Sequence, residues 1–124
     1  MPTGVPPSIL VAEDQTDIRD LLVMNLRSAG YEVSAVGDGE QALARQLASP
    51  ADLLVLDLMM PRMTGFDVLA GLRDMGEARP RVIVLSARGR EEDVIRAFAL
   101  GADDFVAKPF NPHELLARIA RLVK

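Results

Sequence analysis

The sequence predicts an α/β domain built on a parallel sheet, and three observations support this fold class. Five short aliphatic runs recur along the 124 residues, and segments with helical apolar spacing separate them. Three of the runs are continuously apolar, as in strands that are covered on both faces. No linker-like or low-complexity stretch interrupts the alternation. Strands that alternate with helices form parallel sheets with right-handed crossovers and helices on both faces, so one such domain is expected.

The five predicted strands are short and rich in aliphatic residues. They comprise Ile9–Ala12, Val33–Val36, Leu53–Leu56, Val82–Leu85 and Phe105–Ala107. Runs of this length between turn signals are typical of strands rather than of helices.

The segments between the strands carry apolar stripes at the three- and four-residue spacing of an amphipathic helix. The stripes comprise Ile18, Leu21, Leu22 and Leu26 after the first strand, Ala42, Leu43 and Leu47 after the second, and Leu115, Leu116, Ile119 and Leu122 after the fifth. Each stripe predicts a helical face that packs against the sheet.

Residues at the expected helix ends agree with these boundaries. The clearest helix start is Asn111-Pro112-His113-Glu114, which combines a capping side chain, proline at the first helical position and an acid in the first turn. Thr64, with Asp67 three residues later, resembles a capping box. The other expected N-caps are Thr16 and Asp38, and the expected left-handed helix ends are Gly30 and Gly101.

Composition excludes several classes of function. The formal net charge of −4 argues against direct nucleic-acid binding, which requires clustered Lys and Arg. The absence of cysteine excludes disulfides and thiolate metal sites. No apolar run approaches the ~20 residues needed to cross a bilayer, so the cytoplasm is the expected location. Residues 1–7 are rich in proline, lack the features of a signal peptide and predict a flexible N-terminal segment before a domain at 8–124.

Side chains with reactive groups follow four of the five predicted strands. Glu13 and Asp14 come directly after the first strand, Asp57 after the third, Ser86 after the fourth and Lys108 after the fifth. The carboxyl ends of parallel strands meet at one edge of the sheet, where doubly wound folds bind ligands. These residues are therefore expected to converge on one pocket.

The three acids in this group are not explained well by helix capping. Thr16 is the expected cap beside Asp14, and the helix after Asp57 is expected to begin only near Gly65. Two carboxylates ~4 Å apart repel by roughly 4 kcal/mol at an effective dielectric near 20, which is large against the stability of a fold. Hard oxygen ligands without histidine or cysteine favour Mg²⁺ as the compensating cation. A carboxylate, a hydroxyl and an ammonium group around Mg²⁺ suit phosphoryl transfer.

Five motifs, in order along the chain, match one known family. They are Ile9–Asp14, Leu54–Pro61, Thr64-Gly65, Leu85–Ala87 and Gly101–Phe110. With these motifs, Ser8 to Lys124 resembles the receiver domain of bacterial two-component response regulators, and most resembles receivers attached to winged-helix DNA-binding domains. The resemblance implies a flavodoxin-like, doubly wound (βα)5 fold with a five-stranded parallel sheet of order 2-1-3-4-5. It also implies a phosphoacceptor signalling domain, which catalyses only its own phosphorylation and slow autodephosphorylation.

The resemblance assigns roles around the expected metal ion. Asp57 is the nucleophile, which forms an aspartyl phosphate. Asp14 binds Mg²⁺ directly, Glu13 holds it through water, and Asp57 and the backbone carbonyl of Met59 complete the protein ligands. Met59 and Arg88 also stand at positions that tune the lifetime of the phosphoryl group, and the apolar Met59 side chain predicts a long lifetime.

The resemblance also assigns residues to catalysis and switching. Lys108 neutralises the phosphoryl oxygens and pairs with Asp57 when phosphate is absent, with a cis bond to Pro109 placing its ammonium group. Ser86 donates its hydroxyl to a phosphoryl oxygen. Phe105 is the aromatic switch, which turns inward as Ser86 moves.

The implied partner is a sensor histidine kinase, which supplies the phosphoryl group. Activation is expected to change the face formed by the fourth helix, fifth strand and fifth helix, where similar receivers form homodimers through salt bridges. Asp103, Glu114 and Arg118 match that salt-bridge pattern. Three apolar residues stand where charged partners are expected, namely Val94, Ala99 and Ala120.

Regulation of transcription through an attached DNA-binding domain is the main functional hypothesis, and a stand-alone regulator acting by protein–protein contacts is the alternative. A haloacid-dehalogenase-type phosphatase needs an Asp-x-Asp motif where this chain has Asp14-Gln15-Thr16. A flavodoxin-like electron carrier needs a phosphate loop rich in glycine and hydroxyl groups at the same place. A non-phosphorylated pseudo-receiver usually lacks the site residues that this chain retains.

Overall fold

The computed structural model describes residues 5–87 and 89–123. Its elements are β1 (Ser8–Ala12), α1 (Thr16–Ser28), β2 (Glu32–Val36), α2 (Gly39–Ala48), β3 (Leu53–Leu56), α3 (Gly65–Leu72), the 3-10 helix η1 (Arg73–Ala78), β4 (Arg81–Ser86), α4 (Glu91–Ala99), β5 (Asp104–Ala107) and α5 (Pro112–Leu122). The predicted alternation of strands and helices is confirmed. No helix within the described ranges has the length and apolarity needed to span a membrane.

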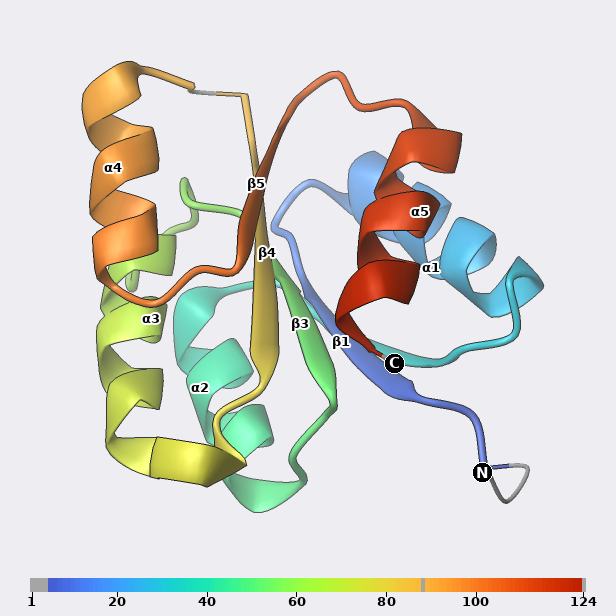
Figure 1. Cartoon of the computed structure of the whole chain (residues 1–124), viewed down its shortest axis with the longest axis horizontal. Helices are drawn as coiled ribbons and strands as arrows, with labels where there is room; N and C mark the ends of the chain where they lie inside the picture. Colours follow the sequence, from blue (N-terminus) through green and yellow to red (C-terminus); the bar gives the residue numbers. More distant parts are fainter. Residues whose placement is uncertain (1–4, 88, 124) are drawn as a thin grey trace.

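The strands form one parallel sheet in the order β2-β1-β3-β4-β5, which confirms the predicted topology (Figure 1). At the carboxyl edge, Ala12 pairs with Val36 on one side and with Leu56 on the other, and Ser86 pairs with Ala107. The segments that follow β1, β3, β4 and β5 therefore leave the sheet at the same edge.

Alternate residues of the strands enter two separate cores, one on each face of the sheet. On one face, strand residues such as Leu10, Leu54 and Val84 pack with α2, α3 and α4. On the other face, residues such as Val11 and Val55 pack with α1 and α5. Figure 1 shows this three-layer arrangement, with α1 and α5 on one side of the sheet and the other three helices on the opposite side. Burial on both faces is the reason that three strands are continuously apolar.

Most of the predicted helix ends are confirmed. The side chains of Asp38 and Asn111 accept backbone hydrogen bonds at the starts of α2 and α5, and Thr64 forms a capping box with Asp67. The helix-terminal glycines have the expected positive φ angles, 98° at Gly30 and 109° at Gly101.

The predicted cap at Thr16 is wrong. The N-cap of α1 is Gln15, whose side chain makes no capping hydrogen bond, and Thr16 is the first helical residue. The Gln15 N–H instead donates to Glu13 Oε2 at 3.1 Å. The Glu13 carboxylate thus bonds the N-cap residue two positions further along the chain.

Candidate functional site

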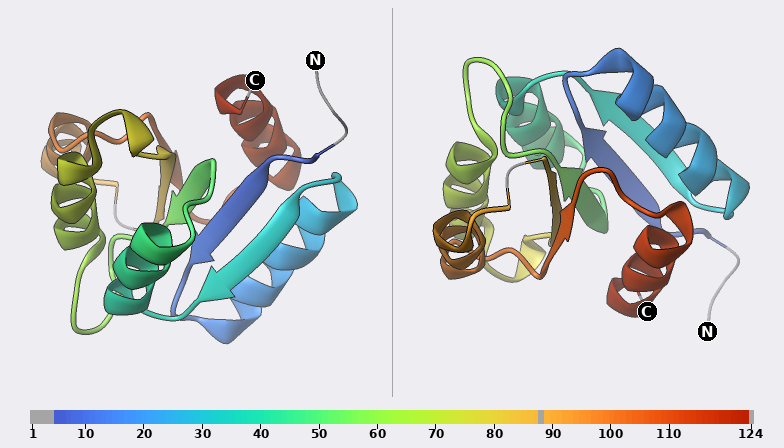
Figure 2. Two further views of the ribbon diagram at one scale, coloured as in Figure 1. Left: turned by 90° about the horizontal axis from the view of Figure 1, so that it is seen from below. Right: turned by 90° about the horizontal axis from the view of Figure 1, so that it is seen from above.

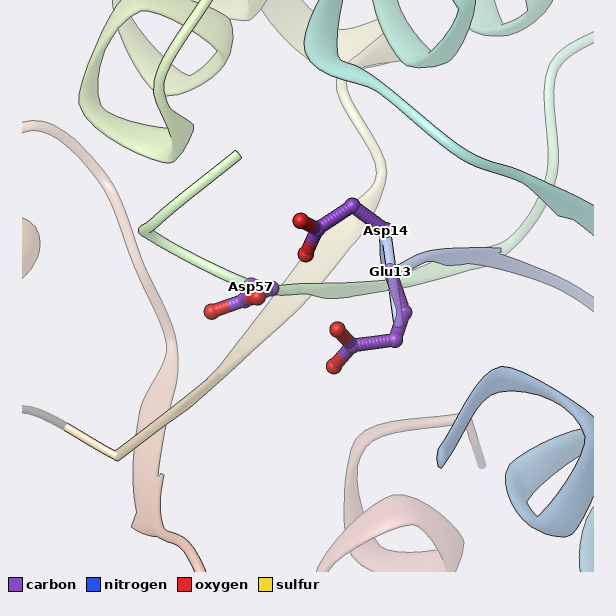
Figure 3. Close-up of side chains that lie close together, drawn as sticks. All are labelled: Glu13, Asp14 and Asp57. Carbon is purple, nitrogen blue, oxygen red and sulfur yellow. The ribbon is translucent and has the colours of Figure 1, made fainter. Parts of the chain in front are cut away.

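Three carboxylates from the ends of the adjacent strands β1 and β3 meet at the carboxyl edge of the sheet. Glu13, Asp14 and Asp57 each offer an oxygen, and these oxygens lie within 4.8 Å of one another (Figure 3). Glu13 and Asp57 are only 1% and 5% exposed, whereas Asp14 is exposed. The predicted convergence of these acids is confirmed.

Backbone hydrogen bonds extend the sheet into this site and fix the acids' main chain. The Glu13 N–H donates to the Val36 carbonyl at 3.1 Å, and the Asp57 N–H donates to the Ala12 carbonyl at 3.0 Å. Figure 3 shows the three side chains projecting from neighbouring strand ends. The parallel register thus places the backbones of Glu13 and Asp57 side by side.

Lys108 supplies the ammonium group that faces these acids. Its Nζ lies 2.6 Å from Glu13 Oε1 and 3.4 Å from Asp57 Oδ2, and its side chain is 10% exposed. The predicted cis bond to Pro109 is present. The pairing with Asp57 is confirmed, but the shorter contact to Glu13 was not predicted. The Lys108 ammonium group therefore pairs with two of the three clustered carboxylates.

This excess of negative charge acts on Asp57. The pKa of Asp57 is raised from its ordinary value of 3.8 to about 6, first by burial and then by the neighbouring Glu13 carboxylate. The Lys108 ammonium group and a 3.2 Å hydrogen bond from the Met59 N–H act in the opposite direction. A bound cation would favour the ionised form of Asp57 more strongly than Lys108 alone does.

A cavity of about 130 Å³ opens beside the acids. It is lined by Asp14, Gln15, Asp57, Met59, Ala87 and Lys108. This volume holds several water molecules at ~30 Å³ each, as Mg²⁺ requires because it keeps much of its hydration shell. The carboxylate oxygens, with no sulfur or imidazole ligand among them, fit Mg²⁺.

The two residues predicted to form the switch lie on neighbouring strands. Ser86 is fully buried at the end of β4. Phe105 is half-buried in β5 and packs against the core that contains α2, α3 and α4. Met59 exposes 48% of its surface, while Arg88 lies outside the described residues.

Sequence reasoning missed three positions at the site. Gln15 and Ala87 line the cavity, although Ser86 was the residue predicted to face it. A Cβ atom at Gly65 would lie 2.6 Å from the Asp57 carbonyl oxygen, so the start of α3 approaches the Asp57 backbone too closely for any side chain. The glycine directly after the Thr64 cap was the available signal for this close approach.

A second charged cluster joins α5 to β5. Arg118 Nη1 lies 3.0 Å from both carboxylate oxygens of Asp104, and Arg121 Nη2 lies 3.4 Å from one of them. Arg118 also contacts Glu114 at 3.3 Å. Asp103 pairs instead with Arg79, which precedes β4, and with Arg81, the first residue of β4. Residues expected to form salt bridges between subunits therefore make ion pairs within the chain.

Comparison with known proteins agrees with the fold and the motifs. The family model described as "Response regulator receiver domain" matches residues 9–120. The chain is 43% identical over 117 residues to the sensory transduction protein RegX3 of Mycolicibacterium smegmatis, covering 94% of this chain and 50% of that protein. It is 45% identical over 121 residues to the DNA-binding dual master transcriptional regulator RpaA of Synechocystis, covering 95% and 49%.

A solved structure agrees with the same fold. The chemotaxis protein CheY4 of Vibrio cholerae superposes with a TM-score of 0.88 at 31% identity, over 94% of this chain and 98% of that one. The chain spans about half the length of the curated relatives it matches.

Proposed function

The chain belongs to the response regulator receiver domain family, and from this premise we propose that Asp57 is its phosphoacceptor. The main support for this proposal is the cavity beside Asp57, which Asp14 and Lys108 also line. Membership in this family also decides against the phosphatase and electron-carrier hypotheses.

In the proposed reaction, a carboxylate oxygen of Asp57 bonds to the phosphorus atom of a phosphohistidine on a sensor kinase. The P–N bond breaks, and the imidazole nitrogen keeps the electron pair. Asp57 must be ionised to attack, and with a pKa of about 6 it is mostly ionised at neutral pH. Lys108 neutralises charge on the phosphoryl oxygens, and the Ser86 hydroxyl donates to one of them after Ser86 moves toward the cavity.

Asp14, Glu13, Asp57 and the Met59 carbonyl are the proposed holders of Mg²⁺, with Glu13 acting through water. When bound, Mg²⁺ supplies positive charge for the transferring phosphoryl group. Because Lys108 already contacts Glu13 at 2.6 Å, the carboxylate of Glu13 is oriented before any metal arrives. Asp14, which is exposed, remains open to an entering ion.

The proposed output is a change on the face formed by α4, β5 and α5, triggered by Ser86 and Phe105. Phosphorylation adds nearly two negative charges, and the end of β4 leads directly into the loop before α4. The relatives extend well beyond the matched region, and RpaA is described as a DNA-binding transcriptional regulator. We therefore propose a cytoplasmic regulator in which this domain controls an attached DNA-binding domain, with homodimerisation through the same face. A stand-alone regulator is the alternative.

A labelling experiment tests the proposed function. The protein is incubated with acetyl phosphate, with and without Mg²⁺, and its intact mass is measured. We expect Mg²⁺-dependent addition of one phosphoryl group, absent in Asp57→Asn. Modification that persists in Asp57→Asn, or that occurs equally in EDTA, would contradict the proposal.

A further inference from the structure

Asp38 and Arg62 tie the start of α2 to the loop between β3 and α3. Arg62 Nη1 lies 2.9 Å from Asp38 Oδ2, and the Asp38 side chain is 8% exposed. The other carboxylate oxygen of Asp38 accepts a hydrogen bond from the Gln41 N–H at 2.8 Å, which caps α2. Asp38 thus uses one oxygen for the helix cap and the other for the loop.

The backbone of Arg62 adopts a conformation that is unfavourable for its residue type. Its φ angle is 68°, the one positive value at a non-glycine position among the described residues. The left-handed region costs an L-residue with a Cβ atom roughly 1–2 kcal/mol. Such conformations persist where surrounding contacts fix them, and they concentrate at functional sites.

The loop that contains Arg62 is packed closely at both ends. At its outer end, a Cβ atom at Gly39 would collide with the Met63 carbonyl, so the loop backbone lies directly on the start of α2. Where the loop ends at α3, Gly65 lies against the backbone of Asp57 and donates its N–H to the Leu58 carbonyl at 2.9 Å. Figure 2 shows this connection running beside α2 in both views.

We propose that Asp38 and Arg62 are positioning residues for the metal-ligating part of this loop. The inference rests on the proposed function, because it takes the Met59 carbonyl as a ligand of Mg²⁺. Leu58 and Met60 anchor the near half of the loop in the core, with exposures of 1% and 6%. The ion pair anchors the far half, so the backbone on both sides of Met59 is held. Small displacements of a ligating atom are costly for binding and reaction alike.

Two matched substitutions separate positioning from simple charge effects. Asp38→Asn retains an equally good N-cap and removes the charge. Arg62→Asn removes the guanidinium group and tolerates positive φ. If the two residues acted only through their charges, Asp38→Asn would weaken Mg²⁺ binding and Arg62→Asn would strengthen it. A positioning role predicts that both substitutions weaken it.

The test is a Mg²⁺ titration of each single variant and of the double variant, followed by backbone amide NMR shifts. We expect the Kd to rise about 3- to 10-fold in each single variant, at or below the lower limit of the roughly 10- to 100-fold effects of groups that orient metal ligands. The Kd of the double variant for Mg²⁺ should be no higher than the higher Kd of the two single variants, because each single substitution already removes the same ion pair. Arg62→Gly, which relieves the backbone strain, provides a second variant at the same position. The control is Arg81→Asn. Arg81 is an exposed arginine at the start of β4 that pairs with Asp103, and its replacement should leave the Kd for Mg²⁺ unchanged.

Different results overturn different conclusions. Opposite shifts in the two single variants, additive effects in the double variant, or unchanged affinity would overturn the positioning role and leave the proposed function intact. Failure of the wild-type protein to bind Mg²⁺ would overturn both. Acetyl phosphate labelling of the same variants adds a kinetic readout, in which a positioning defect raises the Mg²⁺ concentration needed for half-maximal labelling.

Discussion

Asp57 and Asp104 are two buried aspartates of the same sheet in opposite electrostatic surroundings. Asp57 follows β3 and is 5% exposed, while Asp104 begins β5 and is 7% exposed. Asp57 shares the Lys108 ammonium group with Glu13 and also lies within 4.8 Å of an Asp14 carboxylate oxygen. Asp104 instead has two guanidinium groups within 3.4 Å.

Burial alone therefore does not distinguish a functional acid from a structural one. The balance of charges around the carboxylate distinguishes them. Asp104 is neutralised by its own chain, so it joins α5 to β5 and needs no ligand. Asp57 is held where its ionised form is disfavoured, which is typical of sites that await a cation or a reaction. If this contrast is correct, substitutions at Asp57 and Asp104 should differ in labelling, stability and metal response.

The largest effect concerns phosphorylation. Asp57→Asn should reduce Mg²⁺-dependent labelling by acetyl phosphate to background, whereas Asp104→Asn should leave the labelling unchanged. Of these two aspartates, Asp57 lines the cavity and Asp104 does not. Intact-mass spectrometry measures both. Loss of labelling in both variants would show that the two acids are not functionally distinct.

The second effect is on stability without metal, where the two substitutions should act in opposite directions. Asp57→Asn should stabilise the domain by up to about 3 kcal/mol at pH 7.5, because it removes a carboxylate whose pKa is raised to about 6 and leaves Lys108 paired with Glu13. Asp104→Asn should destabilise it by about 1–3 kcal/mol by leaving Arg118 without its bidentate partner. Urea denaturation in EDTA gives both values, and shifts of the same sign would contradict the contrast.

Mg²⁺ should restore part of the stability that the acids cost. At ten times the Kd, binding to the native state alone stabilises a protein by about 1.4 kcal/mol. We expect a stabilisation of this size in the wild type and in Asp104→Asn, and a much smaller one in Asp57→Asn. Thermal melting at increasing Mg²⁺ concentrations provides the measurement.

The pH dependence should follow the raised pKa of Asp57. Between 3.8 and about 6 the folded state binds more protons at Asp57 than the unfolded state does, so the contribution of Asp57 to stability falls as pH rises through this window. Relative to Asp57→Asn, the wild type in EDTA should lose about 1 kcal/mol between pH 5 and pH 7.5. A difference that is constant with pH would show that the carboxylate of Asp57 is not destabilised by its surroundings.

The smallest stability effect is expected at Asp14. Because Asp14 is exposed, Asp14→Asn should change the metal-free stability by less than about 1 kcal/mol, well below the effect at Asp57. The same substitution should nevertheless weaken Mg²⁺ binding strongly, since Asp14 is a proposed direct ligand. Melting curves in EDTA and a Mg²⁺ titration separate the two effects, and a large stabilisation in EDTA would contradict the assignment of the electrostatic cost to Asp57.

The order of strands and helices, the topology and the acids of the site could all be predicted from the amino-acid pattern. Asp38, Thr64 and Asn111 cap helices through bonds to residues two or three positions away, so local pattern suffices to find them. Asp14 and Asp57 meet because parallel strands end at one edge, which follows from the alternation of strands and helices.

The way in which the charged groups share their partners depends on packing between distant segments. Lys108 contacts Glu13 more closely than Asp57, across 95 positions of sequence. Asp38 likewise forms an ion pair with Arg62, which lies 24 positions further along the chain. Such choices depend on differences of less than 1 Å between side chains from distant segments, and packing sets these differences.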